Sequence, residues 1–197
     1  MDYQLTPWGY EVVGGLPPLI DEFTFNAATG GKWEGDARVC AAIGIASSAI
    51  RDACGWHIAP NLQCRLTVDG EGSRGIWLPT TCMTALEKLE VMGAADSDPQ
   101  WSRIGRVLAS APLPHRLQAA VVEYRAGLPT VPDSLMGIVS GVVVRSIALA
   151  YGVSSESVAG VSVSYTAGGY GGSPAATLTD MELSQLSAYK VVRAHAT

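Results

Sequence analysis

The chain has 197 residues, enough for one domain with additional arms, and its net charge is −5 with no basic run anywhere. A protein that grips phosphates needs clustered Lys and Arg, so this sequence argues against tight nucleic-acid binding. It leaves open a protein that DNA passes through. Charged residues make up 16% of the chain, below the usual fraction of about 25%, so we expect other chains to cover part of the surface.

Prolines and glycines interrupt the first 18 residues, which excludes a long helix or a central strand there. This stretch nevertheless carries Tyr3, Trp8, Tyr10 and Val12, and a purely solvated tail would be poorer in aromatic residues. We interpret residues 1–18 as an extended N-terminal arm whose side chains contact a neighbouring subunit. The alternative is that the arm folds back on its own domain.

Two helices are predicted next, a short one over residues 20–29 and a long one over residues 36–54. Asp36 can cap the long helix, and Gly55 stands where a C-terminal glycine is expected. The long helix has a single apolar stripe, because apolar residues recur at spacings of four and three: Val39, Ile43, Ala46, Ile50 and Ala53.

Four strand-like runs follow, at residues 62–68, 76–78, 83–91 and 117–124. The first two flank the turn at residues 69–75, so the sequence predicts a two-stranded hairpin. The third run is ambiguous between helix and strand. Because the strands cluster and do not alternate with helices, the fold class is α+β, with a β-hairpin-rich insert at about residues 60–126.

A second mainly apolar helix is predicted from Asp133 or Ser134 to Gly152, followed by an extended piece at residues 161–165. Residues 167–177 are expected to form a flexible, glycine-rich link. A last helix should begin at Thr179 or Asp180 and run to about Arg193. Its apolar side needs a partner to cover it, and the alternative is that it completes the core of its own subunit.

No motif carries a convincing chemistry. The turn from Gly70 to Gly75 fits G-x-G-x-x-G, but a strand follows it where a dinucleotide site needs a helix, so the glycines are better explained as turn residues. The four cysteines show no zinc spacing, and the three histidines are isolated. We therefore predict no catalytic residue, metal ligand or cofactor, and expect that the protein is not an enzyme.

The order of several pieces resembles the head–tail connector (adaptor) proteins of long-tailed bacteriophages. None of the pieces is specific alone, but together they span most of residues 19–190 in the right order. The pieces are the alanine-rich helix ending in Ala53-Cys54-Gly55-Trp56-His57-Ile58-Ala59-Pro60, the Val68-Asp69-Gly70-Glu71-Gly72 turn, the Ile76-Trp77-Leu78-Pro79 return, the run from Val158 to Tyr165, and the closing run from Leu178 to Lys190.

The resemblance implies a structural virion protein at the head–tail interface, assembled in the host cytoplasm, that forms a dodecameric ring beneath the portal. Its partners would be further copies of itself, the portal protein, and the stopper or tail-side proteins. Double-stranded DNA would pass through the ring without sequence-specific binding, and no membrane is involved. Twelve copies of a chain with net charge −5 would carry −60, which suits a channel that repels phosphate.

The resemblance also implies the domain organisation and a docking site. Residues 83–91 would be a strand within a connector core of residues 19–166, and residues 178–197 would form a C-terminal helix that docks on the portal. The candidate docking residues are Leu178, Met181, Leu183, Leu186, Tyr189, Lys190 and Arg193. The alternatives are another head–tail ring protein, such as a stopper or tail terminator, or a small nucleotide-binding protein that uses the Gly70 turn.

Overall fold

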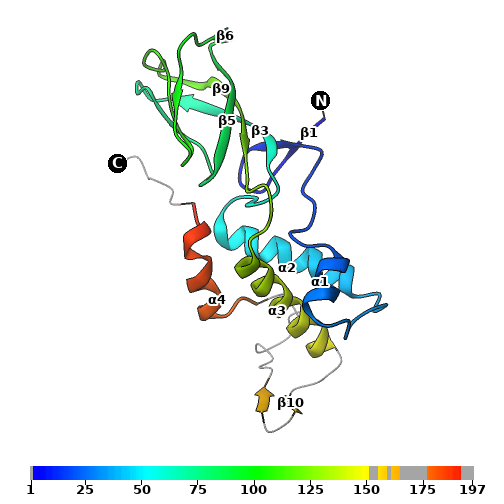
Figure 1. Ribbon diagram of the computed structural model, residues 1–197. Coiled ribbons are helices and arrows are strands. Elements are labelled where there is room, and N and C mark those ends of the chain that lie inside the picture. The colour runs from blue at the N-terminus through cyan, green and yellow to red at the C-terminus, as the bar shows by residue number, and fades with distance from the viewer. Residues whose placement is uncertain (1, 151–154, 159–160, 165–176, 192–197) are drawn as a thin grey trace. The chain divides into compact units, whose positions relative to one another are not determined.

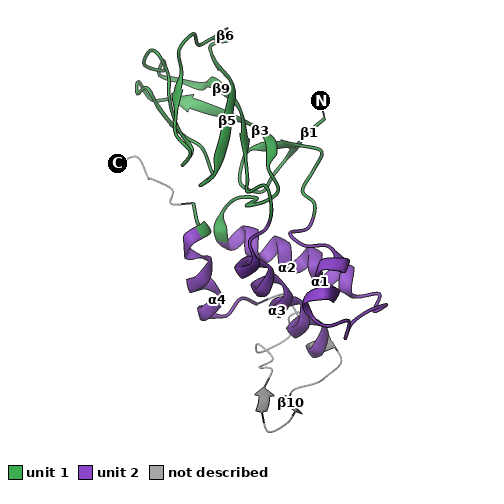
Figure 2. Cartoon of the chain, viewed as in Figure 1, with its two compact units in different colours: residues 1–17, 54–130, 189–197 green, residues 18–53, 131–188 purple. Residues whose placement is uncertain are grey.

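The structure is a computed structural model that describes residues 2–150, 155–158, 161–164 and 177–191 (Figure 1). It confirms the α+β class. The chain forms two compact units, coloured separately in Figure 2. The β unit comprises Met1–Pro17, Cys54–Thr130 and Tyr189–Thr197, and the helical unit comprises Pro18–Ala53 and Val131–Ala188. The predicted insert at residues 60–126 lies within the β unit. Of the predicted link at residues 167–177, all but Thr177 lies outside the described residues.

Four α-helices are described: α1 (Glu22–Ala28), α2 (Val39–Cys54), α3 (Asp133–Ala150) and α4 (Asp180–Gln185). A 3-10 turn, η1 (Leu186–Tyr189), continues α4. Strands β10 (Ser155–Val158) and β11 (Val161–Ser164) pair as an antiparallel ribbon. Because α4 and η1 together end at Tyr189, the last helix is shorter than predicted. Arg193 lies outside the described residues.

Local signals explain where the first two helices begin and end. Asp21 caps α1, with its carboxylate accepting from the Thr24 N–H at 2.7 Å. Asp36 does not begin α2. Its carboxylate accepts from the backbone N–H of Arg38 and from the Arg38 guanidinium, and its carbonyl accepts from the Val39 N–H, so it closes a turn just before the helix. Gly55 has φ 78°, the left-handed conformation that favours glycine after a helix end.

The β unit contains two antiparallel sheets. The six-stranded sheet has the order β1-β2-β3-β9-β5-β6, and the three-stranded sheet has the order β4-β8-β7. The strands of the large sheet are β1 (Tyr3–Leu5), β2 (Glu11–Val13), β3 (Leu62–Gly70), β5 (Met83–Val91), β6 (Ala94–Ala95) and β9 (Arg116–Ala126). Those of the small sheet are β4 (Gly75–Trp77), β7 (Gln100–Trp101) and β8 (Arg106–Leu108).

The predicted hairpin between residues 62–68 and 76–78 is wrong. Strand β3 pairs with β9 along its whole length, and β4 pairs with β8. The register of β3 against β9 shifts between Val68 and Gly70, and the turn that follows carries the chain from the large sheet to the small one. The ambiguous run at residues 83–91 is a strand, as the resemblance implied, and it pairs with the other edge of β9.

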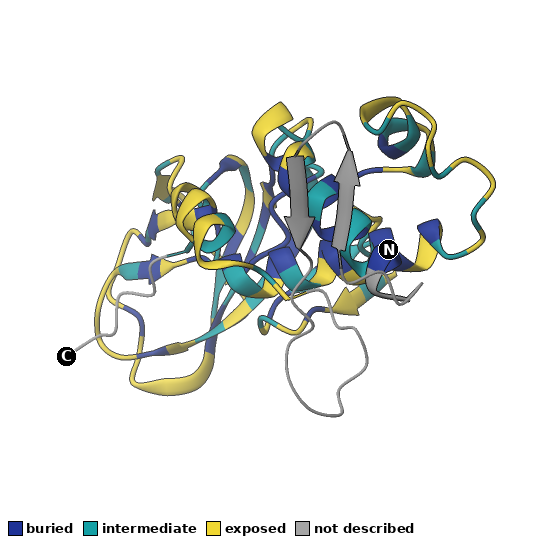
Figure 3. Cartoon of the chain, turned by 90° about the horizontal axis from the view of Figure 1, so that it is seen from below, coloured by how far each residue is buried: buried dark blue, intermediate teal, exposed yellow. Residues whose placement is uncertain are grey.

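Both sheets contribute to one core in the β unit. Cys64, Val122 and Tyr124 come from the large sheet, and Ile76 and Val107 from the small one. The apolar stripe of α2 is likewise buried at Val39, Ile43, Ala46 and Ile50. The loop that precedes α2 is mostly exposed, as Figure 3 shows in yellow. Each unit is therefore stabilised by the burial of its own apolar side chains.

The N-terminal segment is not a free arm. It forms β1 and β2, and β2 pairs with β3 at the edge of the large sheet. Tyr10 and Val12 are buried in the core of the β unit, and Trp8 packs against that core. The structure therefore shows the alternative in which the segment folds back on its own domain. Tyr3 lies on the edge strand, where its ring faces the Arg65 guanidinium at 5.4 Å.

Candidate functional site

The C-terminal segment, residues 177–191, is the part of the chain that the sequence marks most clearly as a docking element. Its helix α4 begins with a capping box. The Thr179 hydroxyl accepts from the Glu182 N–H at 3.3 Å, and the Glu182 carboxylate accepts from the Thr179 N–H at 2.8 Å. These two reciprocal bonds satisfy donors that a short helix would otherwise leave open.

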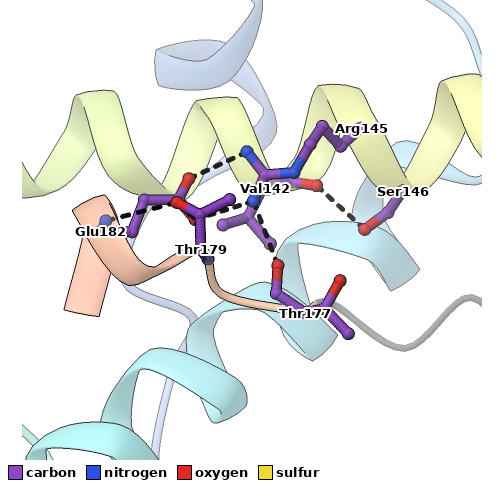
Figure 4. A network of polar contacts seen from close by, with 6 residues as sticks. All are labelled: Val142, Arg145, Ser146, Thr177, Thr179 and Glu182. Atoms are coloured by element: carbon purple, nitrogen blue, oxygen red, sulfur yellow. Dashed lines mark hydrogen bonds and ion pairs between the residues drawn. The ribbon is translucent and has the colours of Figure 1, made fainter. Parts of the chain in front are cut away.

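An ion pair joins α4 to α3 within the helical unit (Figure 4). Arg145 donates from Nη1 to Glu182 Oε1 at 2.9 Å and from Nη2 to Oε2 at 2.8 Å, a bidentate arrangement. Nη2 also donates to the carbonyl of Thr177 at 3.2 Å, so one guanidinium holds both the helix and the residue two positions before its cap. The α3 helix therefore supplies a charged anchor from a mainly apolar sequence.

Burial of the Glu182 carboxyl alone would raise its pKa, but this effect is outweighed. The hydrogen bonds from Arg145 and Thr179 and the positive charge of Arg145 hold the pKa below its ordinary value. Glu182 is therefore ionised at neutral pH, and its carboxylate serves the capping box and the ion pair together.

The end of the segment is held through its own backbone groups by two hydrogen bonds within the β unit. The carbonyl of Tyr189 accepts from Trp56 Nε1 at 2.6 Å, and the Val191 N–H donates to the Cys54 carbonyl at 3.0 Å. Leu186, in the 3-10 turn before these bonds, is fully buried. The segment is thus attached to its own chain at both ends of the described stretch.

The predicted docking residues therefore divide into two groups. Leu186 belongs to the chain's own core, which corrects its assignment to a docking surface. Met181 is 73% exposed and Leu183 and Leu178 are half-buried, so the surface available to a partner centres on Met181. Tyr189 and Lys190 are half-buried as well.

Sequence reasoning missed Arg145 and Glu182. A signal for them existed, since Thr179 and Glu182 have the S/T-x-x-E spacing of a capping box. An arginine in the middle of an apolar helix also calls for a partner, because an isolated buried charge is costly. Neither signal predicts that Arg145 and Glu182 pair with each other, because the two residues lie 37 positions apart in the sequence.

A second polar cluster ties the N-terminal segment to the β unit. The Nε2 atom of buried His57 lies 2.9 Å from the Ala126 carbonyl, which can only accept. Neutral His57 therefore carries its proton on Nε2, and Nδ1 accepts from the Tyr10 hydroxyl at 2.7 Å. The same hydroxyl accepts from the His57 N–H at 3.0 Å. The histidine acts as a structural bridge.

The glycine-rich turn lacks the geometry of a phosphate site. It joins strands β3 and β4, so no helix N-terminus follows it. A Cβ atom at Gly70 would lie 1.9 Å from the Pro114 carbonyl oxygen, and one at Gly72 would lie 2.5 Å from His115 Nε2. Gly72 also has φ +79°. The Pro114 backbone therefore requires glycine at position 70, and the left-handed φ favours glycine at position 72.

None of the four cysteines forms a disulfide; Cys40 is exposed, and Cys54, Cys64 and Cys82 are buried. Burial raises the pKa of Cys54 to about 11 and that of Cys64 to about 12, so both stay protonated at neutral pH. Within the described residues, no three His, Cys, Asp or Glu side chains gather as metal ligands would.

No protein-family model matches the chain, and no curated protein matches it in sequence. Among the helices described here, none combines the length and the apolar character needed to span a membrane. The function is therefore inferred from the residues themselves and from their arrangement.

Proposed function

We propose that this protein is a head–tail connector of a long-tailed bacteriophage, a virion protein that forms a ring beneath the portal and part of the DNA exit channel. The observation that carries the proposal is the order of elements in the chain. The β-rich segment Cys54–Thr130 is inserted between helices α2 and α3, and a short C-terminal helix follows. This is the arrangement that the sequence resemblance implies, with a helical core that carries a β-rich insert.

The distribution of charge supports a role as a channel wall. The helical unit contains nine acidic and four basic residues, whereas the β unit contains nine of each. The whole net charge of −5 therefore resides in the helical unit. In a ring, such a unit would repel DNA phosphates without holding them.

The C-terminal segment is the part that we assign to the portal. Met181 presents an exposed apolar side chain on a helix that Glu182 and Thr179 cap rigidly. A pre-formed helix loses little conformational entropy on binding, which favours docking into a groove. The buried Leu186 anchors this helix while Met181 faces the partner.

Co-sedimentation with phage heads tests the proposal. The purified chain should sediment with heads that contain a portal and stay in the supernatant with portal-free shells of the same coat protein. Equal recovery with both kinds of head, or with neither, would contradict the proposed function.

A further inference from the structure

One end of the small sheet carries an exposed patch, here called the arginine patch: Trp77, Arg103, Ile104 and Arg106. Trp77 lies directly across from Arg106 in the β4–β8 pair, and the Arg106 guanidinium lies 5.4 Å from the indole centroid. The Leu78 N–H donates to the Gly105 carbonyl at 2.8 Å. This bond places Ile104, the residue before Gly105, at the same end of the small sheet as Trp77. Trp77 is 51% exposed and Ile104 is 61% exposed.

The charges of this patch have no acidic counterpart within the described chain. All the ion pairs of the described residues involve other cations, and the side-chain contact of Arg103 is with the Cys82 sulfur at 3.8 Å. Tryptophan and arginine beside an exposed aliphatic residue is the composition that protein interfaces favour. The patch therefore suits a partner that is both apolar and acidic.

The helical unit offers such a surface on α2. The side of this helix away from its buried stripe, here called the α2 outer face, consists of Ala41, Ile45, Ser48 and Asp52, spaced four, three and four residues apart. Ile45 is 53% exposed. Asp52 is exposed and, among the described residues, forms no ion pair. This face is apolar in its middle and acidic at one end.

We infer that the arginine patch of one copy docks on the α2 outer face of the next copy. Trp77 and Ile104 would cover Ile45, and Arg106 would pair with Asp52. The net charges of the two units favour this contact. The β unit is neutral overall and its arginine patch has no acidic partner among the described residues, whereas the helical unit carries −5.

The inferred contact joins two different surfaces, so it is a head-to-tail contact. Contacts of this kind generate rings when the rotation between copies closes. The inference thus rests on the proposed ring function and names the surfaces that would build the ring. It also accounts for the exposure of Trp77 and Ile104 in the β unit and of Ile45 in the helical unit.

Mixed cysteine cross-linking tests the contact directly. Ile45→Cys and Ile104→Cys are made as two separate proteins, each in a Cys40→Ser background. Each protein is oxidised alone, and the two are oxidised as a mixture. The oxidation is carried out both in concentrated solution and with the proteins bound to phage heads. The mixture should yield a disulfide-linked dimer that neither protein forms alone. Leu117→Cys is the matched control for Ile104→Cys and should give none, because Leu117 is at least as accessible, at 75% exposure, but lies outside the patch. A mixture that yields no more dimer than the control in both settings would overturn the inference.

Charge exchange provides the second measurement. Arg106→Glu and Asp52→Arg should each reduce the cross-linked fraction about tenfold, and combining the two proteins should restore it, because the reversed charges attract again. Failure to restore would overturn the inferred pairing. Head binding is scored separately in the same samples. Attachment as a ring without the cross-link contradicts this contact alone, and the cross-link without attachment contradicts the proposed function alone.

Discussion

The hydroxyl of Tyr10 lies 2.7 Å from Nδ1 of His57, a residue 47 positions later in the chain. Through this bond and the contact of His57 with the Ala126 carbonyl, the N-terminal segment is fastened to the centre of the β unit. A residue that sequence reasoning assigned to a subunit-binding arm is thus part of the fold of its own chain.

Tyr10→Phe should destabilise the protein, because it removes the hydrogen bonds of the hydroxyl to His57 Nδ1 and to the His57 N–H. The expected loss in the free energy of unfolding is about 1–3 kcal/mol. Chemical denaturation of the wild type and the variant measures this loss.

Tyr124→Phe is the matched control. The Tyr124 hydroxyl is buried, and within the described structure it has no hydrogen-bond partner. Removing it should leave stability unchanged or raise it by about 1 kcal/mol, because an unpaired buried hydroxyl is costly. Equal losses for the two variants would contradict the assigned role of the Tyr10–His57 bridge.

The Arg145–Glu182 pair should make stability depend on pH. The folded-state pKa of Glu182 is below the ordinary value of 4.5, so the unfolded chain binds more protons as the solution becomes acidic. The stabilisation is complete above about pH 4.5 and is lost as the pH falls through the lower folded-state pKa. Thermal unfolding of the wild type over this range should show the decline.

Glu182→Gln should remove that part of the pH dependence and cost about 1 kcal/mol at neutral pH, since the pair is partly exposed. Gln retains hydrogen bonds for the cap, so α4 should persist. A variant whose melting temperature follows the wild type at every pH would show that the ion pair contributes nothing.

Gly70→Val should destabilise the fold by roughly 2 kcal/mol or more, because the new Cβ would meet the Pro114 carbonyl oxygen at 1.9 Å. Glu71→Ala, next to it on the exposed turn, should change stability by less than about 0.5 kcal/mol. Thermal unfolding measures both. A rise in melting temperature with added nucleotide that Glu71→Ala abolishes would instead support a nucleotide site.

Met181→Glu and Leu186→Ala separate docking from folding. Met181 is exposed, so its replacement should leave the melting temperature unchanged but reduce recovery with portal-containing heads. Leu186 is fully buried, and its truncation should cost about 2–5 kcal/mol. Head binding that survives Met181→Glu at wild-type level would remove Met181 from the docking surface.

The elements that sequence reasoning predicted best are those with local signals. The stripe from Val39 to Ile50 and the glycine at position 55 predict α2, since helix periodicity and termination depend on neighbouring residues. The pairing of β3 with β9 was missed because strand partners are chosen by contacts far apart in the sequence.

The candidate site was predicted only in part, for the same reason. The apolar side of the last helix is visible in the sequence, but its spacing does not tell which members are buried. Leu186 lies in the chain's own core and Met181 faces outward, while the ion pair that joins this helix to α3 comes from Arg145, far away in the sequence. The α2 outer face was passed over because Ala41, Ser48 and Asp52 look like ordinary surface residues.

The most direct test of the account is electron microscopy of portal-containing heads incubated with the purified protein. We predict additional density beneath the portal, in a closed ring of twelve copies around an open channel. Heads that acquire no ring at saturating protein, or protein bound elsewhere on the capsid, would contradict the claim that this chain is a head–tail connector.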